Sequence, residues 1–410
     1  MNTSSLESNA LNTSSKTRAP RLFIVTGDPS ADLHASHVVR HLKARQPDIE
    51  VAAVGDQALR DAGATLIEDQ SQMGQVGAGA FWSAYYHWQL GKRILTYLDT
   101  FQPDIVLLMD YGGFNLRLAK YLKAKGHRIA YFIPPQVWAS RRGRIQTIKR
   151  YIDHVYCIFP FEVPLYEATG IPVTYVGHPL VGQLPPPADR HTFCERHGLS
   201  PDHKIIAIFP GSRKMEIDYL LKPLIEAAQQ LQQQFGTETP LQFVIAKAAS
   251  LKADYFQAKL AQATQGMASP PHVTLVEGEN HALQSVADVG IIKSGTSTLE
   301  TAIYKTPMVI VYKAHWIVGM IARKLAYYPC LGLPNIMTET TDNPIVPELL
   351  QDDVTAQNIC HTISELLNPN SAIYQHEMTG YEQLAQLIPT QNATETVACE
   401  LLKLFNKAIV

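Results

Sequence analysis

The chain has 410 residues, of which 46% are hydrophobic and 18% charged, and its formal net charge is −2. This length and composition are typical of a globular protein with two or three domains. The charge balance does not indicate a nucleic-acid partner, although a local basic patch is compatible with it. The five cysteines occur singly, with no C-x-x-C pair, which indicates a reducing compartment and argues against a disulfide framework or a cysteine zinc site.

The sequence also lacks the usual signals for membrane insertion and secretion. No apolar run reaches the roughly 18 residues of a membrane-spanning helix. The N-terminus has no basic start followed by an apolar run. We therefore expect a cytoplasmic protein.

The first half of the chain alternates between strand-like and helix-like segments. Residues 1–18 are rich in Ser, Thr and Asn and are expected to be a disordered tail. The predicted strands are residues 21–26, 51–54, 105–109, 129–133, 155–159 and 173–176. Strands that alternate with helices predict a parallel sheet covered on both faces, and we place this domain at residues 19–182.

A proline run marks the boundary. Residues 183–187 read QLPPP, and consecutive prolines cannot continue a helix or a central strand. Alternation then resumes, with predicted strands at residues 205–209, 241–246, 273–276, 290–293 and 308–312. We place a second domain at residues 188–378 and helices at 379–410, leaving open whether these helices cross back to the first domain. The predicted fold is α/β, with two Rossmann-like doubly wound parallel-sheet domains facing a cleft.

The first candidate site is the turn at residues 294–300, which reads SGTSTLE between a predicted strand and helix. The first N–H groups of a helix have no partner within it, and the helix dipole favours negative charge. Glu300, one turn into the helix, is placed to accept hydrogen bonds from ribose hydroxyls. The groups expected to hold phosphate are Ser294, Gly295, Thr296, Ser297 and Thr298. The alternative is an ordinary helix capped by Ser or Thr.

A second loop, residues 209–213 (FPGSR), also joins a predicted strand to a helix. Gly211 and Ser212 belong to its turn, and Arg213 would supply the planar cation that phosphate prefers. Two such loops at one edge of a parallel sheet could converge on a single diphosphate. Because the chain has no G-x-x-x-x-G-K-[ST] motif, the two loops indicate a nucleotide-sugar site rather than a Walker site.

Carboxylates mark the corresponding edge of the first predicted sheet. Asp110 ends an apolar strand, where it could take the proton from an attacking hydroxyl or cap the next helix. Asp28 follows the first strand, with the same two interpretations. Asp32, further into that turn, is the one expected to act as the cap.

Residues 134–142 and a histidine cluster each allow two interpretations. The loop carries prolines, Trp138 and paired arginines, which could line a pocket for an anionic sugar or simply pack. His34, His37 and His41 share a helix face, and the last two have the spacing of a metal pair. We favour a polar helix face and expect no metal.

Two aromatic stretches suit a bilayer surface. The first lies within residues 73–98 and includes Lys92 and Arg93, and the second is residues 316–328. Both combine aromatic, apolar and basic residues at helical spacing. The alternative is that the aromatics pack in the core. The residues expected to face a membrane are Phe81, Trp82, Tyr85, Trp88, Trp316 and Ile317.

These motifs resemble the family of bacterial lipid-A-disaccharide synthases, which are glycosyltransferases of the two-domain GT-B type. The resemblance covers about residue 21 to the C-terminal tail. It is carried by FNLRLAKYLK from Phe114, PPQVWASRRGRI from Pro134, PFEVPLYEATGIPVTYVGHPL from Pro160, PGSRKMEI from Pro210, SGTSTLETAIYKTPMVIVYK from Ser294, and LPNI from Leu333 followed by VPELLQDD from Val346.

The resemblance implies transfer of 2,3-diacylglucosamine from UDP-2,3-diacylglucosamine to 2,3-diacylglucosamine 1-phosphate, with inversion and release of UDP. It implies no cofactor or metal, peripheral association with the inner membrane, and no nucleic acid; a homodimer is left open. Asp110 corresponds to the family's proposed base or acceptor contact, with Asp28 as the other candidate, and Asn335 and Glu348 correspond to polar positions near the donor. The residues expected at the acceptor are Ser30, Asp32, Asn115, Gln136, Trp138 and Arg141.

The departures from the family pattern lie on the acceptor side. Asp28 and Ala31 replace a glutamate and a glycine, and residues 111–113 (YGG) replace Ala-Pro-Asp. The alternatives are another GT-B transferase acting on a UDP-sugar, a UDP-N-acetylglucosamine epimerase, or a catalytically silent nucleotide-sugar binding protein at the membrane surface.

Overall fold

The computed structural model describes residues 18–69, 80–138, 143–236, 239–314, 330–340, 342–389 and 391–407. Among the predicted features, the tail at 1–18 apart from Arg18, together with Arg141, Trp316 and Ile317, lies outside these ranges. Phe81 and Trp82 fall within a described helix, but their side chains are outside the description.

In the described residues, the first sheet has seven strands in the order β3-β2-β1-β4-β5-β6-β7. The strands are β1 (Arg21–Val25), β2 (Glu50–Gly55), β3 (Thr65–Asp69), β4 (Ile105–Met109), β5 (Ile129–Phe132), β6 (His154–Cys157) and β7 (Val173–Tyr175). The second described sheet has six strands in the order β10-β9-β8-β11-β12-β13. These are β8 (Lys204–Phe209), β9 (Leu241–Ala246), β10 (Val273–Val276), β11 (Val289–Lys293), β12 (Met308–Tyr312) and β13 (Glu348–Leu350).

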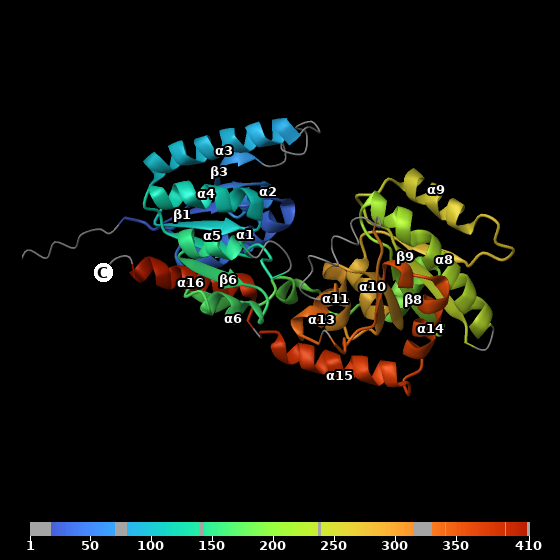
Figure 1. Cartoon of the computed structure of the whole chain (residues 1–410). Helices are drawn as coiled ribbons and strands as arrows, with labels where there is room; N and C mark the ends of the chain where they lie inside the picture. The colour runs from blue at the N-terminus through green and yellow to red at the C-terminus, as the bar shows by residue number, and fades with distance from the viewer. Residues whose placement is uncertain are drawn as a thin grey trace, which may run out of the picture. The chain divides into compact units, whose positions relative to one another are not determined.

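Helices pack on both sides of each sheet (Figure 1). The helices of the first half are α1 (Pro29–Arg45), α2 (Gln57–Asp61), α3 (Ala80–Phe101), α4 (Gly112–Ala124), α5 (Arg144–Tyr151), α6 (Glu162–Glu167), η2 (Val181–Gln183) and α7 (Arg190–His197). Those of the second half are α8 (Lys214–Phe235), α9 (Ala253–Thr264), α10 (Asn280–Val286), α11 (Thr296–Ile303), α13 (Leu333–Met337), η3 (Gln351–Asp353), α14 (Ala356–Leu366), α15 (Ala372–Leu387) and α16 (Ala393–Lys407).

Central strands are apolar on both faces because helices cover both faces. In β8, Ile206 and Ile208 join a core cluster with α8 and α14, while the alternate residues Ile205 and Ala207 are equally buried on the other side. Successive side chains of a strand point to opposite faces of the sheet. A strand covered by helices on both faces is therefore apolar at every position. This confirms the predicted doubly wound parallel-sheet architecture.

Each sheet has a switch point where the strand order reverses direction. In the first sheet it lies between β1 and β4, whose register pairs Val25 with Leu108. In the second it lies between β8 and β11, where Ile292 pairs with Phe209. Ligands of doubly wound sheets bind beyond the carboxyl ends of the strands at this point. The predicted carboxylates and the two predicted anion loops follow these four strands.

The fold divides into two compact units, with boundaries at Phe132/Ile133 and Thr396/Val397. The first unit takes in most of α16, where the Leu404 carbonyl accepts a hydrogen bond of 2.9 Å from Nη1 of Arg128. Strands β3 and β13 were absent from the prediction. β3 has no apolar run, and β13 has only three residues, so neither shows a clear strand pattern.

Candidate active site

The first sheet brings Asp28 and Asp110 together beyond β1 and β4. Burial, followed by the negative charge of neighbouring Asp28, raises the pKa of Asp110. Two carboxylates that share a site resist simultaneous ionisation, so one gains affinity for a proton. The pair is therefore suited to accept a proton from a substrate hydroxyl.

The backbone that presents Asp110 is held in an unusual conformation. Asp110 and Tyr111 have φ of 45° and 48°, in the left-handed backbone region that residues other than glycine rarely adopt. The Asp110 carbonyl accepts hydrogen bonds from Tyr131 Oη at 2.6 Å and from Asn115 Nδ2 at 2.9 Å. Asn115 is fully buried. It therefore holds the turn, a role different from the predicted contact with an acceptor.

The expectation that Asp32 caps the first helix was wrong, whereas the capping interpretation of Asp28 is confirmed. Asp28 is the N-cap of α1 and accepts a hydrogen bond of 2.8 Å from the Ala31 N–H. Asp32 is buried inside α1, and its carboxylate accepts hydrogen bonds from the N–H groups of Asp56 (2.6 Å) and Leu59 (3.3 Å). Asp32 thus stabilises the start of α2. Ser30, also predicted at the acceptor, is exposed in the first turn of α1.

Gly27 leaves the space that Tyr111 occupies. A Cβ at residue 27 would lie 2.3 Å from Cβ of Tyr111. The Tyr111 hydroxyl in turn contacts Nε2 of His87 in α3. Gly27 and His87 together position the residue that follows Asp110.

The 134–138 segment presents one polar residue and buries its tryptophan. Trp138 packs edge-on against Phe159 and Phe161, and its Nε1 donates to Oε1 of Glu162 at 3.1 Å. Burial raises the pKa of Glu162 to about 8. Gln136, in contrast, is exposed. Of the two predicted interpretations of Trp138, the structure shows packing.

In the second unit, the 209–213 loop folds around the carboxylate of Glu216. The N–H groups of Ser212 and Arg213 donate to Oε2 of Glu216 at 2.9 and 3.2 Å. Gly211 has a φ of 116°, and a Cβ there would lie 2.4 Å from Oε2 of Glu216. The Arg213 Nη1 lies 3.6 Å from Oε1 of Glu216, but the side chain is 78% exposed, so its guanidinium is accessible to a ligand.

Some hydroxyl groups of the 294–300 turn donate hydrogen bonds to nearby backbone carbonyls. Ser294 donates to the carbonyl of Leu331 at 2.8 Å, and Thr298 donates to the carbonyl of Gly295 at 2.7 Å. Thr296 is exposed and Ser297 is half-buried. The hydroxyls best placed for a ligand are therefore those of Thr296 and Ser297.

Glu300 is oriented by two residues of α10 that the sequence reasoning missed. Buried Gln284 donates from Nε2 to Oε2 of Glu300 at 3.0 Å and also to Ser297 and Thr301. His281 Nε2 lies 3.7 Å from the other oxygen of Glu300. Because α10 precedes β11, no local spacing connects these residues to the turn.

Asn335 and Glu348 form a hydrogen-bond network next to the 294–300 turn. Glu348 accepts hydrogen bonds from Leu331 N, Gly332 N and Asn335 Nδ2 at 2.7–2.9 Å. Asn335 is fully buried and exchanges hydrogen bonds with the backbone of Val346. The network holds the 331–337 segment, whose Leu331 carbonyl accepts from Ser294.

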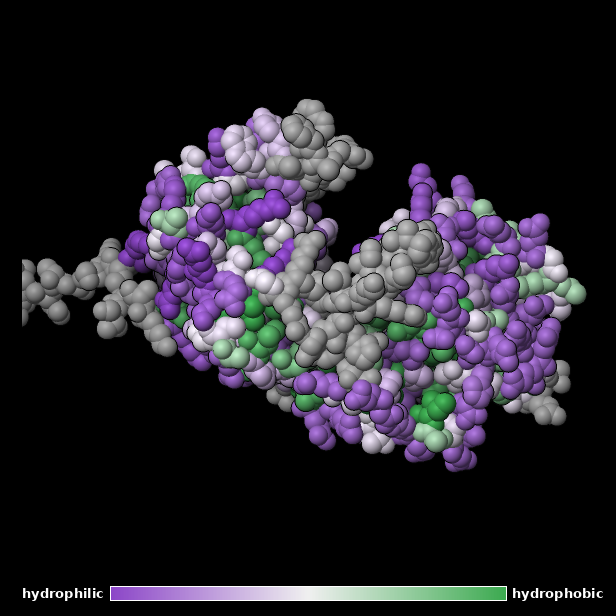
Figure 2. Space-filling view, in the orientation of Figure 1, coloured by the Kyte–Doolittle hydropathy of each residue, from purple (hydrophilic) through white to green (hydrophobic). Residues whose placement is uncertain are grey.

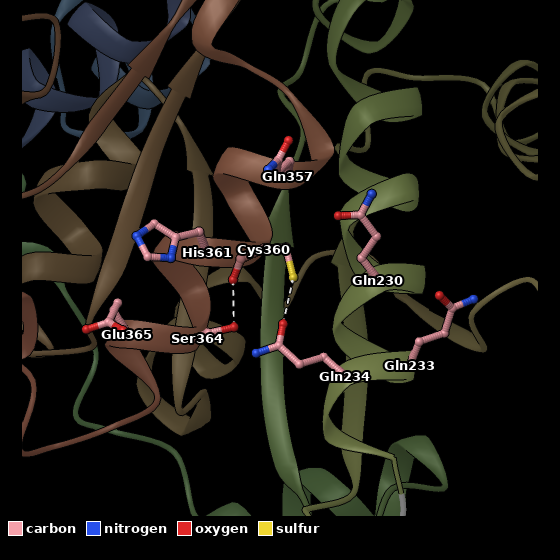
Figure 3. A pocket seen from close by; sticks show the side chains of 8 residues that line it. All are labelled: Gln230, Gln233, Gln234, Gln357, Cys360, His361, Ser364 and Glu365. Atoms are coloured by element: carbon pink, nitrogen blue, oxygen red, sulfur yellow. Dashed lines mark hydrogen bonds between the residues drawn. The ribbon is translucent and has the colours of Figure 1, made fainter.

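A cavity of about 570 Å³ lies apart from these loops (Figure 3). It is lined by residues of α8 and α14, and Figure 3 shows Cys360 Sγ donating to Oε1 of Gln234. Gln230 is sixteen residues along α8 from Lys214, or roughly 24 Å at 1.5 Å per residue. The cavity is thus remote from the N-terminal end of α8, where the 209–213 loop lies.

Helix α3 exposes aromatic side chains. Tyr85 and Trp88 are 49% and 55% exposed, their rings lie 6.1 Å apart, and Lys92 Nζ lies 3.8 Å from the Trp88 ring centroid. In Figure 2 the surface over α3 is pale, which marks intermediate hydropathy. Within the described parts of the chain, no helix combines the length and hydrophobicity needed to cross a bilayer.

The three histidines of α1, His34, His37 and His41, are each half-buried. Burial, and then the charge of His37, lowers the pKa of His34 to about 4. Among the described residues, no three His, Cys, Asp or Glu side chains come together as a metal site.

Sequence comparisons connect this geometry to known proteins. The sequence model of a family described as lipid-A-disaccharide synthetase matches residues 22–401. Lipid-A-disaccharide synthase from Coxiella burnetii (strain Dugway 5J108-111) is 33% identical over 384 residues, covering 92% of this chain and 96% of that protein. Lipid-A-disaccharide synthase 1 from Legionella pneumophila is 37% identical over 364 residues, covering 86% and 90%.

Solved structures share the fold at low sequence identity. UDP-GlcNAc 2-epimerase from Neisseria meningitidis bound to UDP-GlcNAc has a TM-score of 0.59 and 13% identity, covering 93% of this chain and 100% of that one. MurG from Acinetobacter baumannii has a TM-score of 0.58 and 15% identity, covering 94% and 99%. These similarities support the GT-B architecture.

Proposed function

The chain belongs to the lipid-A-disaccharide synthase family, and on this premise we propose that it joins two acylated glucosamine units into the lipid A disaccharide. The donor is UDP-2,3-diacylglucosamine and the acceptor is 2,3-diacylglucosamine 1-phosphate. The products are the β-1,6-linked disaccharide 1-phosphate and UDP. The family match over residues 22–401 carries the proposal.

The carboxylate pair of the first sheet supplies the base in this proposal. Asp110 takes the proton of the acceptor 6-hydroxyl as the hydroxyl oxygen bonds to the donor anomeric carbon. The bond from that carbon to the UDP oxygen breaks on the opposite face, so a single displacement inverts the anomeric centre. Asp28 assists because its negative charge raises the proton affinity of Asp110.

The two loops of the second sheet hold the departing UDP. The N-terminal ends of α8 and α11 provide N–H groups and favourable dipoles for the diphosphate. Arg213 adds an exposed guanidinium, and Glu300, oriented by Gln284, accepts hydrogen bonds from the ribose. The proposed reaction requires no metal or cofactor.

Acylated substrates require an enzyme at a lipid surface. Exposed Tyr85 and Trp88, with Lys92 over the indole ring, form a surface of the kind that inserts between lipid headgroups. We place this surface of α3 on the inner membrane. The acyl chains of donor and acceptor would then remain in the bilayer during transfer.

Product analysis by mass spectrometry tests the proposal. Purified protein would be mixed with both substrates in detergent micelles containing EDTA. The expected result is a tetra-acyl disaccharide 1-phosphate with one UDP released per disaccharide. Conversion of UDP-N-acetylglucosamine without acceptor would favour an epimerase, and UDP release without disaccharide would mean a different acceptor.

The variant Asp110→Asn tests the base. It is expected to lose about a hundredfold or more of kcat, the scale of a positioned general base, while still binding UDP. Asp104→Asn is a matched control because Asp104 also lies beside β4, at its opposite end, and bonds Arg18. Full activity in Asp110→Asn would rule out Asp110 as the base.

A further inference from the structure

A mostly buried ion pair connects the two loops of the second sheet. Nζ of Lys293 lies 2.7 Å from Oε1 of Glu216, and the two side chains are only 17% and 11% exposed. Lys293 is the last residue of β11, and Glu216 is in the first turn of α8. Because β8 and β11 are neighbours in the sheet, the ion pair spans its switch point.

The Glu216 carboxylate also organises the 209–213 loop. While Oε1 contacts Lys293, Oε2 accepts from the N–H groups of Ser212 and Arg213. Burial alone would raise the pKa of Glu216, but the hydrogen bond from Lys293 and those from the loop outweigh it and hold the pKa below its usual range. The carboxylate therefore stays ionised.

An ionised carboxylate beside a diphosphate site poses an electrostatic problem. Like charges at short distance repel strongly where water is excluded. Lys293 is the nearer and more buried of the two cations at Glu216, since its Nζ lies 2.7 Å from Oε1 whereas Nη1 of exposed Arg213 lies 3.6 Å from the same oxygen. The Lys293 Nζ also lies 4.0 Å from the position of a Cβ built on Gly295, in the 294–300 turn. A single cation thus lies next to both loops.

We propose that Lys293 is a positioning residue for the donor diphosphate. It holds the Glu216 carboxylate, and through it the 209–213 loop, in register with the 294–300 turn, and it cancels the charge that would repel phosphate. The inference rests on the proposed function, since it takes the ligand of the two loops to be the diphosphate of a nucleotide sugar.

Calorimetric titration of the full-length protein with UDP and with uridine tests this role. Lys293→Met is expected to weaken UDP binding by about tenfold or more, the scale of a charge-assisted hydrogen bond, and to leave uridine affinity unchanged. Lys293→Arg keeps the charge and is expected to retain most of the UDP affinity. Lys204→Met is the control, because Nζ of Lys204 makes a 2.8 Å ion pair with Asp288 at the opposite edge of the same sheet.

The double variant Lys293→Met/Glu216→Gln addresses folding. Breaking a buried ion pair strands one charge, and removing both charges relieves that penalty. We expect the double variant to recover thermal stability and, because the carboxylate that would repel phosphate is gone, to bind UDP more tightly than Lys293→Met does. If the double variant bound UDP no more tightly than Lys293→Met, or if Lys293→Met weakened UDP and uridine equally, Lys293 would not act on the diphosphate by neutralising Glu216. Wild-type protein that binds no UDP would overturn the proposed function itself, whereas wild-type binding that Lys293→Met leaves unchanged would overturn this inference alone.

Discussion

The Tyr111 hydroxyl contacts Nε2 of His87, which connects the residue after Asp110 to helix α3. The rings of His87, Tyr111 and Phe114 lie 5.5–5.6 Å from one another, centroid to centroid. The same helix exposes Tyr85 and Trp88. The helix that we place on the membrane is therefore in direct contact with the turn that carries the proposed base.

Removing the Tyr111 hydroxyl should weaken the contact between this turn and α3 while leaving the aromatic ring in place. Tyr111→Phe keeps the ring against Gly27 but loses the contact with His87, and we expect a severalfold lower kcat with little change in KM for the donor. Steady-state kinetics in micelles would measure both. Tyr121→Phe, on the exposed side of α4, is the control, and equal kcat values for the two variants would contradict the prediction.

The pH dependence of activity should report the carboxylate pair. The base must be deprotonated, and the pKa of Asp110 is raised, so kcat/KM should fall on acidification at a pH above the usual range of an aspartate. Asp28→Asn removes the neighbouring negative charge and should move this acidic limb to lower pH. A limb that stays in place or moves upward would show that Asp28 does not perturb the base.

Gln284 should matter for the donor. Replacing it with leucine removes the donor that fixes Glu300, and we expect KM for the UDP-sugar to rise about tenfold, the scale of one lost hydrogen bond to a charged group. Gln242→Leu is a suitable comparison because Gln242 bonds the backbone of Ser200 in the same unit. The prediction fails if the two variants have the same KM.

Buried Glu377 should make stability depend on pH. Burial raises its pKa to about 8, while its Oε1 accepts from the Met308 N–H at 2.8 Å. Between about pH 4.5 and 8 the folded state keeps a proton that the unfolded chain releases, so the free energy of unfolding falls as pH rises, by an order of a few kcal/mol. Glu377→Gln should reduce this fall.

Urea unfolding at pH 6 and pH 9 measures the effect. Glu162, whose pKa is also raised to about 8, contributes in the same window, so part of the slope should remain. Glu382→Gln, on the exposed side of α15, controls for the substitution itself. An unchanged difference between the two pH values in Glu377→Gln would contradict the assignment.

Membrane binding should depend on the exposed aromatics of α3. We expect the double variant Tyr85→Ser/Trp88→Ser to bind anionic vesicles several times more weakly than wild type, because it loses interfacial apolar area. Co-sedimentation with phosphatidylglycerol vesicles measures the bound fraction. Tyr121→Ser, which removes an exposed tyrosine from α4, should bind as wild type does, and equal binding by the double variant would exclude α3 as the contact surface.

The sequence by itself determined the architecture and located the loops that we propose for the chemistry. Buried strands are apolar along their length and helices repeat every 3.6 residues, so local periodicity located most strands, including β4 and β9 at their observed bounds. Glycine and hydroxyl residues directly after a strand likewise identified the loops beyond β8 and β11. These features depend on residues close together in the chain.

The tertiary structure decided which group each side chain serves. The sequence predicted that Asp32 caps its own helix, but the Asp32 carboxylate stabilises the start of α2 instead, because β2 lies beside β1 in the sheet. The same holds for Lys293 with Glu216 and for Gln284 with Glu300, which lie far apart or on different elements in the chain. Such pairs depend on strand order and helix packing, which bring distant residues within hydrogen-bonding distance. No local spacing in the sequence therefore predicts them.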